Sequence, residues 1–238
     1  MLKEAMEWIS EKTGNVIEFD LNGEKYTNRE IYKVEKSRRK ELTVTTLTGL
    51  VDYIKSAFDG KEEYIVSVLS HHKVAVESKL NANKRREFVI VSNAQLPAVN
   101  LNSFMDLEQF NIQLQSVFVP SDERAKVLSL IGNIRAENVM QTGDNGISQQ
   151  VEVKRGVASK AKEEVPNPVY LKPFRTFTEI SQPESAFVLR LREGGSIGLQ
   201  AALYEADGGA WKNQAILSIK EYLEEELKEQ QNRITILA

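Results

Sequence analysis

The spacing of apolar residues changes several times along this chain, and this change of period constrains the fold more than any other feature of the sequence. A spacing of three and four residues places side chains on one face of a helix, whereas alternation places them on one face of a strand. Helical spacing recurs in residues 2–9, 47–58, 107–118, 125–131 and 209–228. The sequence therefore predicts about five amphipathic helices.

Short runs rich in β-branched and aromatic residues lie between these helices. Asn22-Gly23 follows one such run and favours a tight hairpin turn, because both residues tolerate positive φ angles. Strands are predicted at residues 16–21, 24–27, 42–45, 64–69, 74–80, 88–92, 133–141, 147–155, 175–180, 186–192, 197–205 and 233–237. Short turns between neighbouring runs favour antiparallel pairing. We therefore predict an α+β fold with mixed or mainly antiparallel sheets.

The chain of 238 residues is long enough for one large domain or two small ones. Residues 160–173 contain three prolines after a charged start, which predicts a linker or an extended arm. This segment would separate an N-terminal α+β region, residues 1–159, from a C-terminal ββ(β)αβ unit, residues 174–238. The alternative is that all of these residues form one compact domain.

The absence of cysteine excludes disulfides, thiolate nucleophiles, Cys-ligated zinc and iron–sulfur clusters. No run of apolar residues approaches the roughly 18 to 20 that a membrane helix needs. Residues 1–14 are charged throughout, whereas a signal peptide has an apolar centre. We therefore expect a cytoplasmic protein with no membrane partner and no cofactor.

Charge is strongly segregated along the chain, although the formal net charge is only −3. Residues 28–40 hold six basic residues against two acidic ones, and residues 217–229 hold five glutamates against two lysines. Acidic side chains at the C-terminal end of a helix oppose its dipole unless a basic surface faces them. We therefore expect a homo-oligomer and predict a charge interface, within one subunit or between two, that joins Arg38, Arg39 and Lys40 to Glu224, Glu225 and Glu226.

No catalytic constellation stands out in the sequence. His71 and His72 are the only histidines, and adjacent positions in a predicted turn suit the joint ligation of a metal poorly, so exposed turn histidines are predicted. The glycine pair at residues 208–209 lacks the spacing of a phosphate-binding loop, and Asp207 is placed to accept the free amides of the next helix. The carboxylates form adjacent runs that a solvated surface explains. No catalytic, cofactor-binding or metal-binding residue is predicted.

A second basic tract, formed by Lys84, Arg85 and Arg86, lies in a predicted turn just before Phe88. Basic side chains beside an aromatic ring are typical of surfaces that bind nucleic acid or another anion. The acidic pI of about 5.7 and the absence of RNP, zinc-finger and helix-turn-helix signatures argue against such a surface. Nucleic-acid or anion contact by this tract is therefore the less favoured hypothesis.

Three longer segments resemble a phage and prophage protein family of Gram-positive hosts, and the chain is similar to a distant branch of the YfdQ-like prophage proteins. The segments are residues 41–60, 165–195 and 202–228, and the phrases PFRTF and EADGGAW within them are fairly specific. The resemblance implies a phage-encoded, cytoplasmic, non-virion accessory protein of a bacterial host. It implies no catalytic residue, because the function of that family is not established.

Three functional hypotheses follow from the residues and the resemblance together. The leading one is a non-enzymatic phage accessory protein that binds a host defence component or a small signalling molecule such as a nucleotide. The alternative is a nucleic-acid-binding accessory of phage recombination or replication. The least favoured is a hydrolase that uses scattered carboxylates and a divalent metal.

Overall fold

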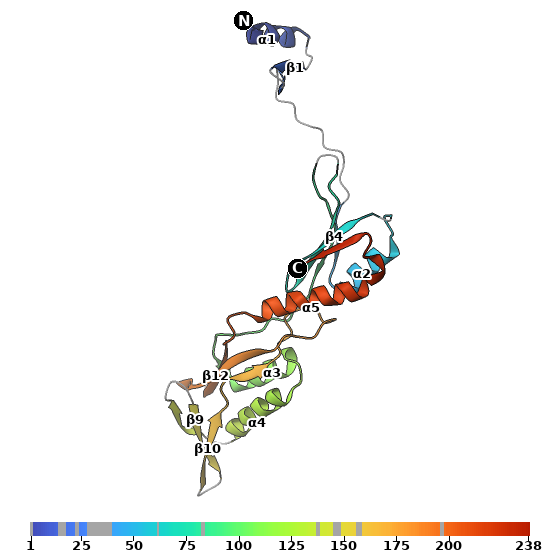
Figure 1. Cartoon of the computed structure of the whole chain (residues 1–238). Helices are drawn as coiled ribbons and strands as arrows, with labels where there is room; N and C mark the ends of the chain where they lie inside the picture. Colours follow the sequence, from blue (N-terminus) through green and yellow to red (C-terminus); the bar gives the residue numbers. More distant parts are fainter. Residues whose placement is uncertain are drawn as a thin grey trace. The chain divides into compact units, whose positions relative to one another are not determined.

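The computed structural model describes residues 2–13, 18–21, 24–27, 40–60, 62–81, 84–136, 139–144, 149–155, 159–195 and 198–238 (Figure 1). Contacts divide the chain into two units, Met1–Arg39 and Lys40–Ala238. The first unit contains helix α1 (Leu2–Thr13) and an antiparallel hairpin of β1 (Glu18–Leu21) and β2 (Glu24–Thr27). The helix and both strands were predicted, whereas the predicted turn Asn22-Gly23 lies outside the described residues.

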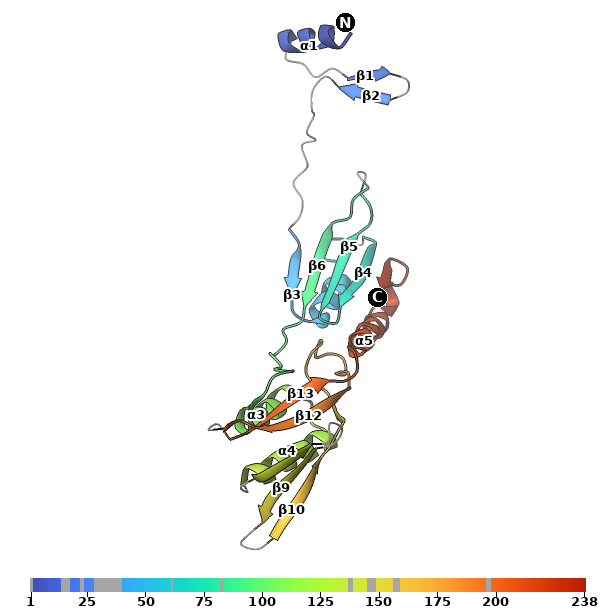
Figure 2. The ribbon, with the colours of Figure 1, turned by 90° about the vertical axis from the view of Figure 1, so that its left-hand side faces the viewer.

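The second unit contains a five-stranded mixed sheet in the order β14-β4-β5-β6-β3 (Figure 2). Its central strands form the predicted antiparallel meander, and each edge strand runs parallel to its neighbour. The strands are β3 (Leu42–Val44), β4 (Tyr64–Ser70), β5 (Lys73–Ser78), β6 (Phe88–Asn93) and β14 (Ile234–Leu237).

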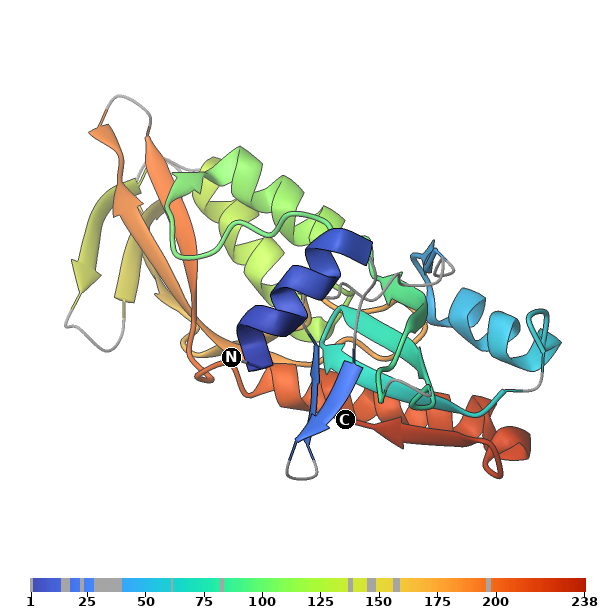
Figure 3. The ribbon, with the colours of Figure 1, turned by 90° about the horizontal axis from the view of Figure 1, so that it is seen from above.

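Helices α2 (Leu47–Ser56) and α5 (Trp211–Glu226) pack on this sheet, and α5 also lies beside β14 (Figure 3). Thr46 caps the start of helix α2, because its hydroxyl accepts a hydrogen bond from the Gly49 amide at 3.1 Å. The apolar faces of both helices and the sheet form one buried cluster that includes Leu50, Val66 and Ile219.

A four-stranded antiparallel sheet in the order β11-β12-β13-β7 forms a second layer with helices α3 (Leu107–Val117) and α4 (Asp122–Ala136). Asp106 and Ser121 cap the two helices by accepting from the Gln109 and Arg124 amides at 2.9 and 3.1 Å. Phe110 and Phe187 are buried in the core that this sheet and the two helices form. The strands are β7 (Met105–Asp106), β11 (Val169–Leu171), β12 (Ser185–Glu193) and β13 (Leu199–Glu205).

A three-stranded antiparallel sheet contains β8 (Val139–Asp144), β9 (Gln149–Arg155) and β10 (Ser159–Val165). The hairpin of the first two strands was predicted, but the strand prediction from residue 133 is wrong at its start. Helix α4 continues to Ala136, because Ile131 and Ile134 extend its buried face past Gly132. The segment predicted as a linker or arm, residues 160–173, contains most of β10 and all of β11.

Residues 174–238 contribute to both larger sheets, since β12 and β13 belong to the four-stranded sheet and β14 to the five-stranded one. The predicted strand at residues 175–180 is wrong, because these residues lie in turns and bends. The α+β fold with mixed and antiparallel sheets is confirmed, with five α-helices among the described residues. Among all the residues that the structure describes, no helix is long and apolar enough to span a membrane.

Candidate functional site

Arg175 occupies the centre of a polar cluster inside the second unit. Its side chain is 8% exposed, and Nη1 donates to Glu205 Oε1 at 2.7 Å. Nη2 donates to the hydroxyl of Ser185. The guanidinium also lies over the ring of Trp211, with 3.8 Å between Cζ and the ring centroid. The two hydrogen bonds and the stacking on Trp211 together fix the orientation of this buried cation.

Asp207 extends this cluster towards α5. Its carboxylate accepts hydrogen bonds from the Ser185 hydroxyl and, at 3.0 Å, from the Gly209 amide. Burial acts to raise the pKa of Asp207, but the hydrogen bonds from Ser185 and Gly209 and the charge of Arg175 outweigh it, so this pKa lies below its usual value. Asp207 therefore accepts an amide hydrogen bond in the turn before the helix, whereas its predicted capping of the first amides of α5 is wrong. At Ala210, the N-cap of α5, no described side chain makes a cap hydrogen bond.

Burial lowers the pKa of Arg175 to about 10, although the carboxylates of Glu205 and Asp207 act in the opposite direction. The guanidinium therefore stays positively charged at neutral pH. One guanidinium then faces two carboxylates, and the ammonium of Lys212 lies 5.8 Å from the Trp211 ring centroid. The cluster is close to neutral, so its charge does not favour an anionic ligand.

The two histidines lie in the turn between β4 and β5, as predicted, but only His72 is exposed. The ring of His71 packs edge-on against Trp211, with 4.7 Å between centroids, and its carbonyl accepts from the Thr176 hydroxyl at 2.6 Å. Partial burial lowers the pKa of His71, and the neighbouring charges of His72, Lys212 and Arg175 act in the same direction. His71 is therefore held in its neutral form beside the cluster.

Acidification is expected to destabilise the protein through His71. Because the pKa of His71 is lower in the folded chain, the unfolded chain binds a proton first as the pH falls below about 6.5. This contribution to stability is complete at higher pH and is lost as the pH falls from that value towards the folded pKa. Urea unfolding at pH 7.5, 6.5 and 5.5 should show a smaller loss of stability in His71→Gln than in the wild-type chain, and an unchanged pH dependence in this variant would contradict the prediction.

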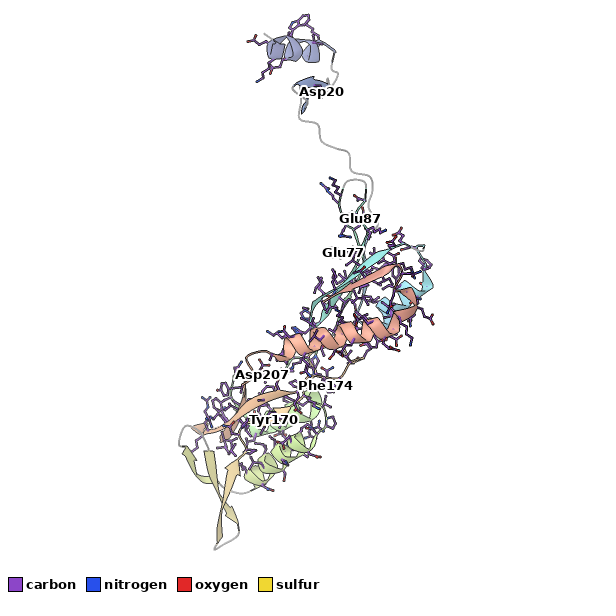
Figure 4. All side chains as sticks on the ribbon, viewed as in Figure 1. Asp20, Glu77, Glu87, Tyr170, Phe174 and Asp207 are labelled. Atoms are coloured by element: carbon purple, nitrogen blue, oxygen red, sulfur yellow. The ribbon has the colours of Figure 1, made fainter. Side chains whose placement is uncertain are left out.

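A cavity of about 200 Å³ opens against the Arg175 cluster, and we call it the Arg175 pocket. Its polar lining residues are Arg175, Glu205 and Trp211. Figure 4 shows Phe174, another lining residue, and Asp207 near the start of α5. The remaining walls are apolar and are formed by Leu96, Pro97, Val99, Leu101 and Pro173. The combination of an apolar wall and a few convergent polar groups is typical of ligand sites.

Two residues that line this pocket carry a buried donor with no hydrogen-bond partner among the described residues, Arg175 at Nε and Trp211 at Nε1. Both residues are 7% exposed, and both nitrogens lie out of contact with solvent. An unsatisfied buried donor costs about 1–3 kcal/mol, so most such groups in proteins are paired. A ligand that presents an acceptor to these two donors would recover part of that cost.

The predicted basic tract lies on the exposed loop between β5 and β6. Lys84 adopts a left-handed conformation with φ of 56°, and Arg86 Nη1 donates to the Ser78 carbonyl at 3.2 Å. Arg86 also lines an open cavity of about 390 Å³ with Lys79 and Arg233. The structure therefore places Arg86 beside two further cations that the sequence did not group with it.

The acidic run at the end of α5 pairs with nearby lysines. Glu226 contacts Lys55 of α2 at 2.7 Å, Glu225 contacts Lys228 at 2.7 Å, and Glu224 contacts Lys220 at 3.7 Å. Lys40 is exposed. Arg38 and Arg39 lie outside the described residues, so the predicted charge interface stays a prediction.

The Arg175 cluster was missed as a site by sequence reasoning. Arg175 belongs to the PFRTF phrase, and Glu205, Asp207 and Trp211 belong to EADGGAW, the two phrases that carry the family resemblance. The specificity of these two phrases was the signal in the sequence that could have located the cluster. No group of three or more His, Asp or Glu side chains in the described ranges is arranged to hold a metal ion.

Comparison of the chain with protein-family models, with curated proteins and with solved structures gives no match.

Proposed function

We propose that this chain is a non-enzymatic binding protein whose Arg175 pocket receives a compact apolar group of another molecule. The observation that carries this proposal is the pair of buried, unpartnered donors on Arg175 and Trp211, two residues that line a largely apolar cavity. Such a pocket offers apolar burial and two N–H groups to an acceptor. The ligand therefore combines a small apolar body with at least one acceptor atom.

The polar groups of the cluster support binding more than catalysis. The Ser185 hydroxyl is buried and held between the Asp207 carboxylate and the guanidinium of Arg175. A nucleophilic serine needs an aligned general base and access to substrate. Asp207 and Glu205 are both engaged with neighbouring groups, so neither is presented as a free carboxylate.

The family resemblance supplies the biological context of the proposal. We propose an accessory protein of a bacteriophage that acts in the cytoplasm of the bacterial host, self-associates and binds a host defence component. A pocket of about 200 Å³ is smaller than the roughly 300–1,000 Å³ of sites that enclose drug-sized ligands. This size disfavours the enclosure of a whole signalling nucleotide.

The test uses the indole N–H of Trp211 as a reporter. Trp8 and Trp211 are the only tryptophans, so a Trp8→Phe chain has one indole resonance in a ¹H–¹⁵N spectrum. We expect 4-methyl-2-pentanone, which carries an isobutyl group and a carbonyl, to shift this resonance saturably. Val99→Phe should fill the pocket and abolish the shift, whereas Leu217→Phe on the exposed side of α5 should leave it unchanged. An unmoved indole resonance would overturn the proposal.

A second candidate function, nucleic-acid binding, is favoured by one observation. Lys84, Arg85 and Arg86 are all exposed on the β5–β6 loop, close to Phe88, which is 47% exposed. Basic side chains with an accessible aromatic ring suit a single-stranded nucleic acid. Purified protein with an absorbance ratio at 260 and 280 nm typical of protein alone would argue against this candidate.

A further inference from the structure

We infer that the group received by the Arg175 pocket is part of a polypeptide, an apolar side chain together with its own main-chain amide. This inference rests on the proposed function and names the class of its ligand. It is carried by the hydrogen-bonding groups of the pocket, by its charge and by its apolar wall.

The pocket offers the two kinds of hydrogen-bonding group that a peptide unit needs. The unpartnered Nε of Arg175 and Nε1 of Trp211 are donors, and they suit a carbonyl oxygen with its two lone pairs. Glu205 lines the same cavity and is 29% exposed at its side chain, with Oε1 bound to Arg175. A carboxylate accepts up to about four hydrogen bonds, so Glu205 retains capacity for a ligand N–H. One donor and one acceptor on each residue is the pattern of the main chain.

The charge of the site favours a neutral ligand. The Arg175 guanidinium is already compensated by Glu205 at 2.7 Å and faces the carboxylate of Asp207 through Ser185. A phosphate or a free carboxylate would meet these two carboxylates in a partly buried site, where like charges repel strongly. A main-chain amide carries no charge and avoids that repulsion.

The apolar wall of the pocket can receive the side chain that adjoins the ligand's main-chain amide. Leu96, Pro97 and Val99 come from the segment between β6 and β7 that forms neither helix nor strand. Because the two donor nitrogens lie out of contact with solvent, a ligand carbonyl reaches them only as wall side chains shift, and these three wall residues lie outside regular structure. Arginine and tryptophan are also enriched among the residues that dominate protein–protein binding energy.

The experiment compares three neutral probes on the Trp8→Phe chain, again through the Trp211 indole resonance. N-acetyl-leucine-N′-methylamide carries an isobutyl side chain and peptide groups, 4-methyl-2-pentanone carries the isobutyl group and a carbonyl without N–H, and N-acetylglycine-N′-methylamide lacks the side chain. One additional hydrogen bond corresponds to a roughly 5- to 10-fold change in Kd. We expect the leucine amide to bind by that factor more tightly than the ketone, and the glycine amide to bind more weakly than both.

The outcomes separate this inference from the proposed function. Equal affinities of the ketone and the leucine amide would overturn the polypeptide inference and leave the pocket as a binding site for compact carbonyl compounds. Tighter binding of adenosine monophosphate than of the leucine amide would also overturn it, in favour of a small nucleotide. A failure of every probe to move the indole resonance would overturn both proposals.

Discussion

Arg175→Ala is expected to lower the free energy of unfolding by about 2 kcal/mol, because the buried guanidinium makes charge-assisted hydrogen bonds to Ser185 and to Glu205, whose carboxylate stays accessible to water. Glu205 would lose its partner at 2.7 Å, and Ser185 would lose a donor. The stacking of the guanidinium on Trp211 at 3.8 Å would also be lost. Urea unfolding followed by circular dichroism measures the change, and the m-value should stay constant if the folded and unfolded states keep their exposed areas.

Arg192→Ala is the matched control for this substitution. The Arg192 guanidinium lies over the ring of Phe104, 3.9 Å from its centroid, and its Nε donates to Gln200 at 3.0 Å. Arg192 is exposed, so its ring contact and hydrogen bond compete with water, and we expect a loss of about 0.5 kcal/mol. Equal losses at the two arginines would show that burial and the two carboxylates add nothing at Arg175.

The helices and the central meander were predictable because the physics that forms them is local. Periodicity identified α2 and α3, and the cap residues Thr46 and Ser121 each stabilise a helix start through a hydrogen bond to an amide three residues on. The end of α4 was misplaced because the helical spacing was followed only to residue 131, just before Gly132. The buried face continues to Ile134, so tertiary packing overrides the low helix propensity of one glycine.

The site was less predictable because its contacts are distant in sequence. Arg175 pairs with a glutamate 30 positions away, and Thr176 bonds to the His71 carbonyl 105 positions away. No periodicity or spacing rule reports such pairs from one sequence. Composition did limit the chemistry, because the absence of cysteine and the presence of only two histidines removed most catalytic arrangements before the fold was considered.

The wrong strand at residues 175–180 has a specific cause, which is the side chain of Gln182. Its Oε1 accepts from the amides of Arg175 and Thr176 at 2.9 and 3.2 Å, and its Nε2 donates to the Phe177 carbonyl at 3.0 Å. These are the backbone groups that a strand would pair with a neighbouring strand. The buried side-chain amide of Gln182 therefore takes the place of hydrogen bonds to a neighbouring strand. It also holds the loop that carries Arg175.

Gln182→Leu is therefore expected to lower the free energy of unfolding by about 3 kcal/mol, because buried amides and a carbonyl would lose their partner. Hydrogen exchange at the Arg175 and Thr176 amides should accelerate in this variant, a readout that a loss of packing elsewhere would not produce. Gln214→Leu makes the same chemical change on the exposed face of α5 and should alter stability by less than about 0.5 kcal/mol. If Gln182→Leu is as stable as Gln214→Leu, the loop is held by its apolar contacts. In that case the position of Arg175, and with it the pocket, would not depend on Gln182.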